Sequence, residues 1–281
     1  MQKTEEGDGL LVYDANCRIC IGFTNVLQKM RVIKARECLS YQASAELKNS
    51  IQFDQFKNGV AFRPSGGAEF VYGSQAISIL FGKAFPFMKW FFRISFLLLL
   101  FEFFYKMIAF NRYVILLPKR SLIECDCYPS KAIFYRFTYV CLAFILASLV
   151  FFISDRALSN DRIATAIHSN NLLLLALILP FLIQLFMVYI FSKKNIYEYA
   201  GHLSSVLLLG SLTMLPSVLY DAFFSAGRDT FLFFNLSIFF FAILYMHQKR
   251  IRFMQMSIRW QYFLAILIFA FLLGMKMLYG V

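Results

Sequence analysis

Two cysteines separated by two residues, Cys17 and Cys20, are the side chains in this sequence best suited to chemistry. They follow an apolar run of strand-forming residues, Leu10 to Tyr13, and precede apolar residues at helical spacing. The pair is therefore expected at the start of a helix, where backbone N–H groups without intrahelical partners favour negative charge. This position lowers the pKa of the leading thiol and increases its thiolate fraction near neutral pH.

The spacing predicts a thiol–disulfide exchange site in which the two cysteines have different roles. The thiolate is the species that attacks disulfides, so Cys17 is the expected nucleophile and Cys20, one helical turn later, the resolving thiol. Two reduced thiols without a catalytic role, or one half of a metal site, are the competing interpretations. Asp14 has two candidate roles that are mutually compatible: accepting a proton from the dithiol and capping the following turn through a side-chain oxygen.

Strand and helix signals after the dithiol predict an α/β domain with a thioredoxin-like fold. The expected strands are 38–41, 59–63 and 69–72, and the expected helices are 45–49 and a segment from residue 73 onward. The order β-α-β-α-β-β-α is the thioredoxin arrangement, and it places the dithiol at the C-terminal end of a sheet strand. Residues 88–117 are very apolar but interrupted by charges, which predicts a helical hairpin that covers the sheet or lies along a bilayer surface.

The sequence resembles the DCC family of thiol–disulfide oxidoreductase-like domains, which is named for an Asp-x-x-Cys-x-x-Cys motif. The matching segments are Asp14 to Cys20, Gly73-Ser74-Gln75-Ala76 for the family's Gly-Ser-x-Ala, Ala109 to Tyr113 for its Ala-x-Asn-Arg-Tyr, and Cys127-Tyr128-Pro129 for its closing cysteine and proline. The resemblance covers residues 10 to 129 and implies a redox role and a thioredoxin-like fold, without a substrate. Family members usually have Gly directly after the Asp, whereas this chain has Ala15, so the turn is expected to differ.

The composition predicts that a large part of this chain lies in lipid. The 281 residues are 60% hydrophobic and only 16% charged, whereas soluble domains contain about a quarter charged residues. The net charge of +12 does not indicate nucleic-acid binding, because most Lys and Arg flank apolar segments as topology signals do. The N-terminal residues lack the features of a secretory signal, so the first domain is expected in the cytosol, where a reactive thiol pair is more often catalytic than structural.

Residues 131–281 are predicted to form an all-α polytopic transmembrane domain of about five helices, after a thioredoxin-like domain of residues 1–130. The expected spans are 134–153, 172–191, 203–224, 231–246 and 262–279. Basic residues cluster before the first span, after the second and before the fifth, whereas the other loops are neutral or slightly acidic. The positive-inside rule then predicts a multi-pass protein of the cell (inner) membrane with its N-terminal domain in the cytoplasm and its C-terminus outside.

Two further cysteines, Cys125 and Cys127, stand just ahead of the first span. Three interpretations are open for them: a tetrahedral zinc site shared with Cys17 and Cys20, a second redox pair that relays electrons toward the membrane, or inert or palmitoylated thiols. The last interpretation is favoured, because the two pairs are far apart in the sequence and the Cys-x-Cys spacing is tighter than in usual zinc sites.

Polar residues in or near the predicted spans have a structural and a functional interpretation. The histidines are His168, His202 and His247, and the isolated polar residues are Gln184, Asp221 and Asn235. The histidines are expected to be polar residues at the lipid boundary rather than haem ligands. The other three are expected to form hydrogen bonds between helices rather than a transport path.

These features favour a membrane-anchored thiol–disulfide oxidoreductase with Cys17, Cys20 and Asp14 at its site and with neither a metal nor a cofactor. The expected partners are the lipid bilayer, a protein disulfide or thiol substrate and a membrane protein, but no nucleic acid. The alternative is a non-enzymatic membrane subunit or assembly factor that uses the thioredoxin-like domain for docking. A small-solute transporter is less favoured, because the spans lack paired charges and a visible inverted repeat.

Overall fold

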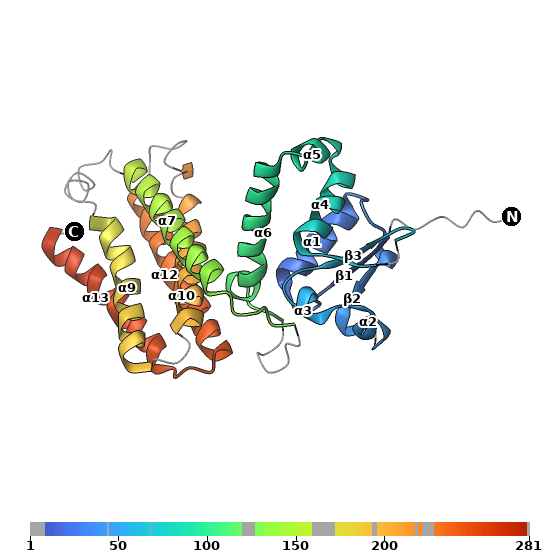
Figure 1. Ribbon diagram of the computed structural model, residues 1–281. Helices are drawn as coiled ribbons and strands as arrows, with labels where there is room; N and C mark the ends of the chain where they lie inside the picture. Colours follow the sequence, from blue (N-terminus) through green and yellow to red (C-terminus); the bar gives the residue numbers. More distant parts are fainter. Residues whose placement is uncertain are drawn as a thin grey trace. The chain divides into compact units, whose positions relative to one another are not determined.

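The computed structural model describes residues 9–43, 45–67, 69–119, 127–158, 172–192, 196–216, 219–220 and 228–279. The chain divides into two compact units, Met1–Arg136 and Phe137–Val281, a few residues after the predicted boundary at 130. We call them the N-terminal unit and the C-terminal unit, and most of their helices and strands are labelled in Figure 1.

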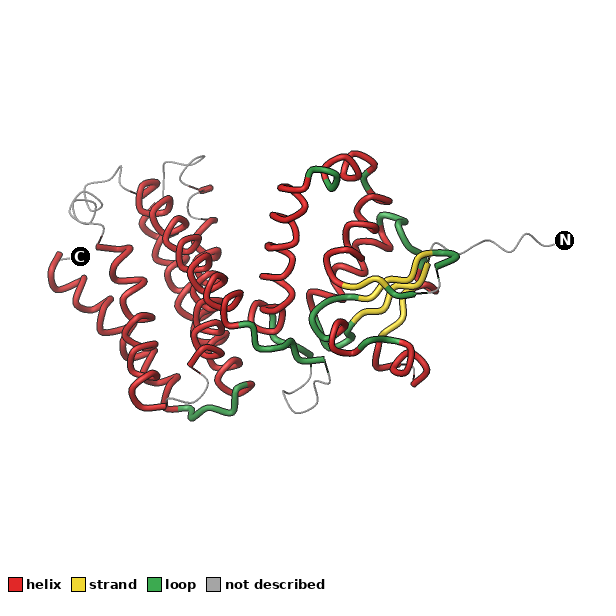
Figure 2. Tube along the Cα trace, viewed as in Figure 1, coloured by secondary structure: helices red, strands yellow, loops and turns green. Residues whose placement is uncertain are grey.

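The N-terminal unit is built on a small mixed β-sheet with helical segments packed on both faces (Figure 2). Its strands are β1 (Gly9–Tyr13), β2 (Cys38–Ser40), β3 (Ala61–Pro64) and β4 (Val71–Tyr72). Its helices are α1 (Arg18–Lys29), α2 (Ala45–Ser50), α3 (Phe53–Phe56), α4 (Gly73–Ala84), α5 (Pro86–Phe91) and α6 (Ser95–Ile115), with 3₁₀ turns η1 (Ala35–Glu37) and η2 (Tyr41–Ala43). The predicted order of strands and helices is present, and α3 is an additional short helix before β3.

The strand order in the sheet is β2-β1-β3-β4. β1 runs parallel to β2 and antiparallel to β3, and β3 pairs antiparallel with β4. β1 is therefore an inner strand with partners on both edges, which explains its nearly continuous apolar run. Its last residue, Tyr13, leads directly into the turn that begins at Asp14.

Side chains alternate between the two faces of the sheet along β1 and β3. Leu11 and its cross-strand partner Phe62 are buried on the face covered by α1 and α4. Val12 and its partner Ala61 are buried on the opposite face, together with Phe56 of α3. Because β1 is packed on both faces, the turn that follows it is held in a fixed position.

The predicted helical hairpin within 88–117 is wrong, because residues 95–115 form one continuous helix. Instead α6 packs against α4, and the short α5 connects them. Tyr105 of α6 lies over two glycines: a Cβ on Gly59 would be 2.7 Å from the Tyr105 hydroxyl oxygen, and one on Gly73 would be 3.4 Å from its ring. Gly73 also has a φ of +60°, a conformation that suits glycine. These close approaches fix α6 beside the sheet.

From residue 133 onward the described elements are all helical. The elements are α7 (Ile133–Leu158), α9 (Leu172–Ser192), α10 (Ile196–Ser211), η4 (Leu212–Met214), α12 (Arg228–Phe253) and α13 (Arg259–Tyr279). Each predicted span overlaps one of the long helices. The bounds predicted for the third span, 203–224, are wrong, because α10 begins at Ile196 and gives way to a 3₁₀ turn after Ser211. Residues 221–224 lie outside the described part of the chain.

Within the described residues, one helical segment is long and apolar enough to cross a membrane. It is Ile133–Ser154 in α7, which has 22 residues and a mean hydropathy of 2.4. Ile178–Ser192 in α9 and Arg259–Ala270 in α13 are apolar but shorter. By length and composition, α7 alone of these segments meets the requirement for a span.

α10 packs against both α9 and α12 in the C-terminal unit. Leu203 and Val206 of α10 share a buried cluster with Phe239 and Ile243 of α12. Gly210 permits this contact, because a Cβ there would lie 2.7 Å from Ile243 Cγ1 and 3.5 Å from the Phe239 ring. Small residues at a helix crossing allow the close backbone approach that is common between membrane helices.

Gly210→Val is expected to destabilise the C-terminal unit by roughly 1–3 kcal/mol, because the added side chain would overpack the α10–α12 contact. The matched control is Gly22→Ala in α1, where a Cβ meets no neighbouring atom within 4 Å. That substitution should stabilise the helix by roughly 0.5–1 kcal/mol. Hydrogen exchange of both full-length variants in detergent measures the two changes, and unaltered protection of α10 in Gly210→Val would contradict the expectation.

Candidate redox site

A tight turn connects β1 to α1 and carries two of the predicted site residues, Asp14 and Cys17, while Cys20 lies in the first turn of α1. The Cys17 N–H donates to the Asp14 carbonyl oxygen at 3.2 Å, and the Asn16 N–H donates to Asp14 Oδ1 at 2.9 Å. Asp14 therefore caps this turn through its side chain, which confirms one of its two predicted roles. Ala15 is not among the described residues with a positive φ, so the turn forms without the glycine that is usual in the DCC family.

Cys17 is the N-cap residue of α1, which begins at Arg18. The Cys20 N–H donates to Cys17 Sγ at 3.0 Å. The two sulfurs are joined in a disulfide, and the two Cα atoms are 5.2 Å apart. The prediction that Cys17 stands at a helix start is confirmed. A reduced Cys17 in this place would face an N–H of the first helical turn, which is the contact that stabilises a thiolate.

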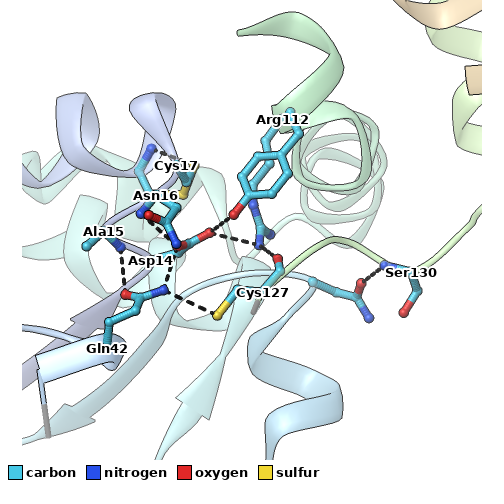
Figure 3. A network of polar contacts seen from close by, with 11 residues as sticks. Asp14, Ala15, Asn16, Cys17, Gln42, Arg112, Cys127 and Ser130 are labelled. Atoms are coloured by element: carbon cyan, nitrogen blue, oxygen red, sulfur yellow. Dashed lines mark hydrogen bonds and ion pairs between the residues drawn. A yellow bond between two sulfur atoms is a disulfide. The ribbon is translucent and has the colours of Figure 1, made fainter. Parts of the chain in front are cut away.

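Asp14 is fully buried, and polar groups from distant segments converge on it (Figure 3). Its Oδ1 accepts a hydrogen bond from Gln42 Nε2 at 2.9 Å in addition to the one from the turn. Its Oδ2 accepts a short hydrogen bond from the Tyr113 hydroxyl and faces Arg112 Nη2 at 3.5 Å. A carboxylate away from solvent is stable only when it is paired and hydrogen-bonded, and both conditions are met.

The same side chains tie the turn to the segment around residue 127. Gln42 Oε1 accepts the Ala15 N–H at 3.0 Å, and Gln42 Nε2 also lies 3.6 Å from Cys127 Sγ. Arg112 Nη2 donates to the Cys127 carbonyl oxygen at 2.6 Å. The turn before the dithiol is thus held by η2, by α6 and by the chain that follows α6.

Gln42, Arg112 and Tyr113 contact Asp14 but are not among the site residues expected from the sequence. The sequence did contain an indication that Arg112 and Tyr113 belong to the site, because they are part of the Asn-Arg-Tyr segment of the family resemblance. Arg112 is also a charged residue within a strongly apolar helix. Nothing in the sequence indicated a role for Gln42, since it stands in a polar segment of ordinary composition.

Aromatic side chains cover the disulfide. Cys17 is 0% exposed and Cys20 is 8% exposed. Tyr113 is buried against them, and Tyr13 and Tyr128 pack on the same cluster. The Tyr113 and Tyr128 rings meet edge to face, with their centroids 5.4 Å apart. Attack of Cys17 on a protein disulfide therefore requires this tyrosine cover to move.

Cys127 lies close to the dithiol turn, as the zinc interpretation requires. It is buried, and its sulfur is next to the Gln42 amide. Cys125 lies outside the described residues. The zinc and second-redox-pair interpretations both need Cys125, so they stay predictions. Among the residues that the structure describes, no group of three or more His, Cys, Asp or Glu side chains is arranged to hold a metal ion.

Gln184 and His247 form hydrogen bonds between helices of the C-terminal unit. Gln184 of α9 donates to the Tyr199 hydroxyl at 2.7 Å and to the Trp260 carbonyl oxygen at 3.1 Å. His247 Nε2 is 3.0 Å from the Tyr199 hydroxyl oxygen, and His247 Nδ1 is 2.7 Å from Gln261 Oε1. The interhelical role predicted for Gln184 is confirmed.

The prediction that His202 and His247 lie at the lipid boundary is wrong. Both side chains are buried between helices, and each has a ring nitrogen within hydrogen-bond distance of a polar group on another helix. His202 Nδ1 is 3.0 Å from Arg250 Nη1. Asn235 is also buried in α12, whereas His168 and Asp221 lie outside the described residues.

Comparisons of the chain with known protein families, with curated proteins and with solved structures gave no match. The geometry around Asp14 and the dithiol is therefore the basis for a functional proposal.

Proposed function

We propose that this protein is a membrane-anchored thiol–disulfide oxidoreductase, with Cys17 as the nucleophile and Cys20 as the resolving thiol. The observation that carries the proposal is the position of the pair: it follows an inner strand, and Cys17 Sγ receives a first-turn N–H of α1. A dithiol at a helix N-terminus favours the thiolate, which is the reactive form.

The N-terminal unit supports a thioredoxin-like fold for this site. A β2-β1-β3-β4 sheet with parallel β1 and β2, antiparallel β3 and β4, and a dithiol after β1 is the arrangement expected of that fold. The segments that resemble the DCC family also meet in space, because Arg112 and Tyr113 contact Asp14 across 98 and 99 sequence positions. These segments are far apart in the sequence and yet converge on one carboxylate, which supports a single common site.

We place this domain on the cytosolic side of a multi-pass membrane protein. In the described part of the C-terminal unit, large apolar side chains such as Phe186, Phe241 and Ile266 are exposed, while polar ones such as Gln184 and His247 are buried. This distribution is the reverse of that in a soluble helical protein, and it suits helices surrounded by lipid. The basic segments that flank the predicted spans favour a cytosolic N-terminal unit.

The proposed reaction begins with the reduced pair. The Cys17 thiolate attacks one sulfur of a target disulfide, a Cys17–target disulfide forms, and the target's other sulfur leaves as a thiolate. The Cys20 thiol gives up its proton, for which Asp14 is the proposed acceptor. The Cys20 thiolate then attacks Cys17 Sγ, and the second target sulfur leaves as a thiolate. Two electrons have passed to the target, the Cys17–Cys20 disulfide has formed, and each step is reversible.

Alkylation of the reduced full-length protein tests this proposal. At neutral pH, Cys17 should react with iodoacetamide at least about tenfold faster than Cys38, as followed by mass spectrometry of the peptides. Cys38 is the internal control, because burial raises the pKa of its thiol and keeps its thiolate fraction low until the pH is well above neutral. Tyr128→Ala should increase the rate at Cys17 further by opening the tyrosine cover. A Cys17 that stays unreactive in both proteins would overturn the proposal.

The full burial of Cys17 favours a second candidate. A non-enzymatic subunit or assembly factor that uses the N-terminal unit as a docking surface would have no need of an accessible thiol. In that case the double exchange Cys17→Ser with Cys20→Ser would leave the cellular function intact.

A further inference from the structure

Large apolar side chains are exposed where α5 meets α6, at one end of the N-terminal unit (Figure 1). They are Phe87 and Trp90 of α5 and Phe96 and Leu99 of α6, and each is between 67% and 70% exposed. Residues three positions apart lie on one side of a helix, so each helix presents its pair together. We call these four side chains the α5–α6 face. An exposed apolar face of this kind marks a binding surface.

The later turns of α6 are covered by the N-terminal unit itself. Phe101 and Tyr105 pack on the buried cluster of α1 and α4. The centroid of the Phe103 ring lies 6.1 Å from that of Tyr135, and Met107 is buried. In α5, by contrast, none of the residues that the structure describes is buried. The exposure of the α5–α6 face is therefore a local feature and not a property of the whole of α6.

The charges around the α5–α6 face are positive. Residues 81–101 contain Lys83, Lys89 and Arg93 but no Asp or Glu, and the Lys89 and Arg93 side chains are exposed. Cations beside exposed Trp and Phe rings suit an anionic lipid surface, where the cations meet phosphates and the rings lie at the level of the headgroups. A protein partner fits this composition less well, because lysine is depleted from protein–protein interfaces.

An almost entirely apolar cavity of about 290 Å³ lies farther along α6. Phe104 and Ile108 line it and are themselves exposed, and Ile19 of α1 and Phe81 of α4 line it as well. Water finds few hydrogen-bond partners in an apolar cavity, whereas an acyl chain gains apolar contacts there. Lipid therefore accounts for the cavity as well as for the α5–α6 face.

We propose that the α5–α6 face is a second membrane contact of this protein and lies in the headgroup region of an anionic lipid leaflet. The C-terminal unit is the first contact, and its connection to the N-terminal unit gives that unit a high effective concentration at the bilayer. A small apolar face is sufficient under this condition, since it does not have to recruit a free domain from solution. The inference rests on the membrane placement proposed above and is independent of the chemistry of the dithiol.

Fluorescence quenching by brominated lipids tests this contact in the full-length protein. The sequence contains two tryptophans, Trp90 and Trp260, so Trp260→Phe leaves Trp90 as the only one. This variant is reconstituted into vesicles of phosphatidylcholine and phosphatidylglycerol with either brominated or ordinary acyl chains. We expect the brominated lipids to reduce the Trp90 emission by about half or more, because a ring at the lipid boundary meets the bromine atoms.

Two control proteins start from the double variant Trp90→Phe with Trp260→Phe. Adding Phe241→Trp places a ring at an exposed position of α12 that the proposed membrane placement assigns to lipid, so its emission should fall as strongly. Adding Phe53→Trp places a ring on α3, which packs on the opposite face of the sheet from α4 and α6. Its emission should fall by less than about a tenth, because that side of the unit is expected in water.

An unquenched Trp90 together with a quenched Phe241→Trp protein would overturn the inference and leave the membrane placement standing, because the face would then lie in water or against protein. Absence of quenching in both proteins would overturn the inference and the membrane placement together. The redox part of the proposed function is measured separately, by alkylation of Cys17.

Charge reversal tests whether anionic lipid is the partner. Lys89→Glu with Arg93→Glu, added to Trp260→Phe, should reduce the quenching of Trp90 in these vesicles about twofold or more, because the new carboxylates repel lipid phosphates. The matched control is Lys48→Glu with Lys57→Glu, which changes the net charge equally but lies in the segment of α2 and α3, and it should leave the quenching unchanged. Equal quenching in the charge-reversed and unaltered faces would contradict an anionic lipid surface as the partner.

Discussion

Cys20→Ser is expected to accumulate mixed disulfides through Cys17, at a level about tenfold or more above that of Cys17→Ser. The first attack needs only Cys17, which keeps its place at the N-cap of α1 in this variant. Resolution needs the Cys20 thiol, so the mixed disulfide can no longer collapse to the internal disulfide. Acid quenching of cells, blocking of free thiols and separation on non-reducing gels reveal captured targets as bands that reductant removes.

Two controls separate this outcome from incidental oxidation. Cys38→Ser should leave the captured bands unchanged, because Cys38 lies in β2 and is not part of the dithiol cluster. Adding Tyr128→Ala to Cys20→Ser should increase capture if the tyrosine cover limits access to Cys17. Absence of captured targets from both Cys20→Ser proteins would favour the docking-subunit alternative, which requires no reactive thiol.

The location of the dithiol could be predicted because its signals are local. An apolar run, a polar turn and two cysteines at a spacing of three residues are enough to indicate a strand, a turn and a helix start. Cys17 at the N-cap and the turn capped by Asp14 follow from these neighbours alone. The five long helices that the structure describes from residue 133 onward were also predicted, since long apolar stretches have few alternatives to helix.

The surroundings of Asp14 could not be predicted in the same way. Gln42, Arg112 and Tyr113 reach it from η2 and α6 only because β1 and α6 pack in one unit, and no periodicity encodes such a contact. The same holds for the burial of Cys17, which depends on Tyr128 from the chain after α6. The start of α10 was placed too late because the residues before 203 include polar side chains. These side chains are buried between helices, so the segment is helical although it lacks the apolar composition of a span.

Asp14→Ala is expected to destabilise the N-terminal unit by about 3–5 kcal/mol, the usual cost of removing one partner of a buried ion pair. The substitution would leave the Arg112 guanidinium buried without its counter-charge. The hydrogen-bond donors of Gln42, Tyr113 and the turn would also lose their acceptor. Hydrogen exchange of β1 and α6 amides in the full-length protein measures the loss. Asp54→Ala is the matched control, because Asp54 is 89% exposed in its pair with Lys57 and such pairs contribute about 1 kcal/mol or less.

Coupling between Asp14 and Arg112 distinguishes the ion pair from a general packing defect. If the uncompensated charge of Arg112 is the main cost, the losses of stability should not add. The double variant Asp14→Ala with Arg112→Met should then lose roughly 1–3 kcal/mol less than the summed losses of the two single variants. Met keeps much of the apolar stem of Arg but brings no charge into the interior. Strict additivity would mean that the 3.5 Å contact between Arg112 Nη2 and Asp14 Oδ2 contributes little, and that the hydrogen bonds from Tyr113 and Gln42 account for the stability of the turn.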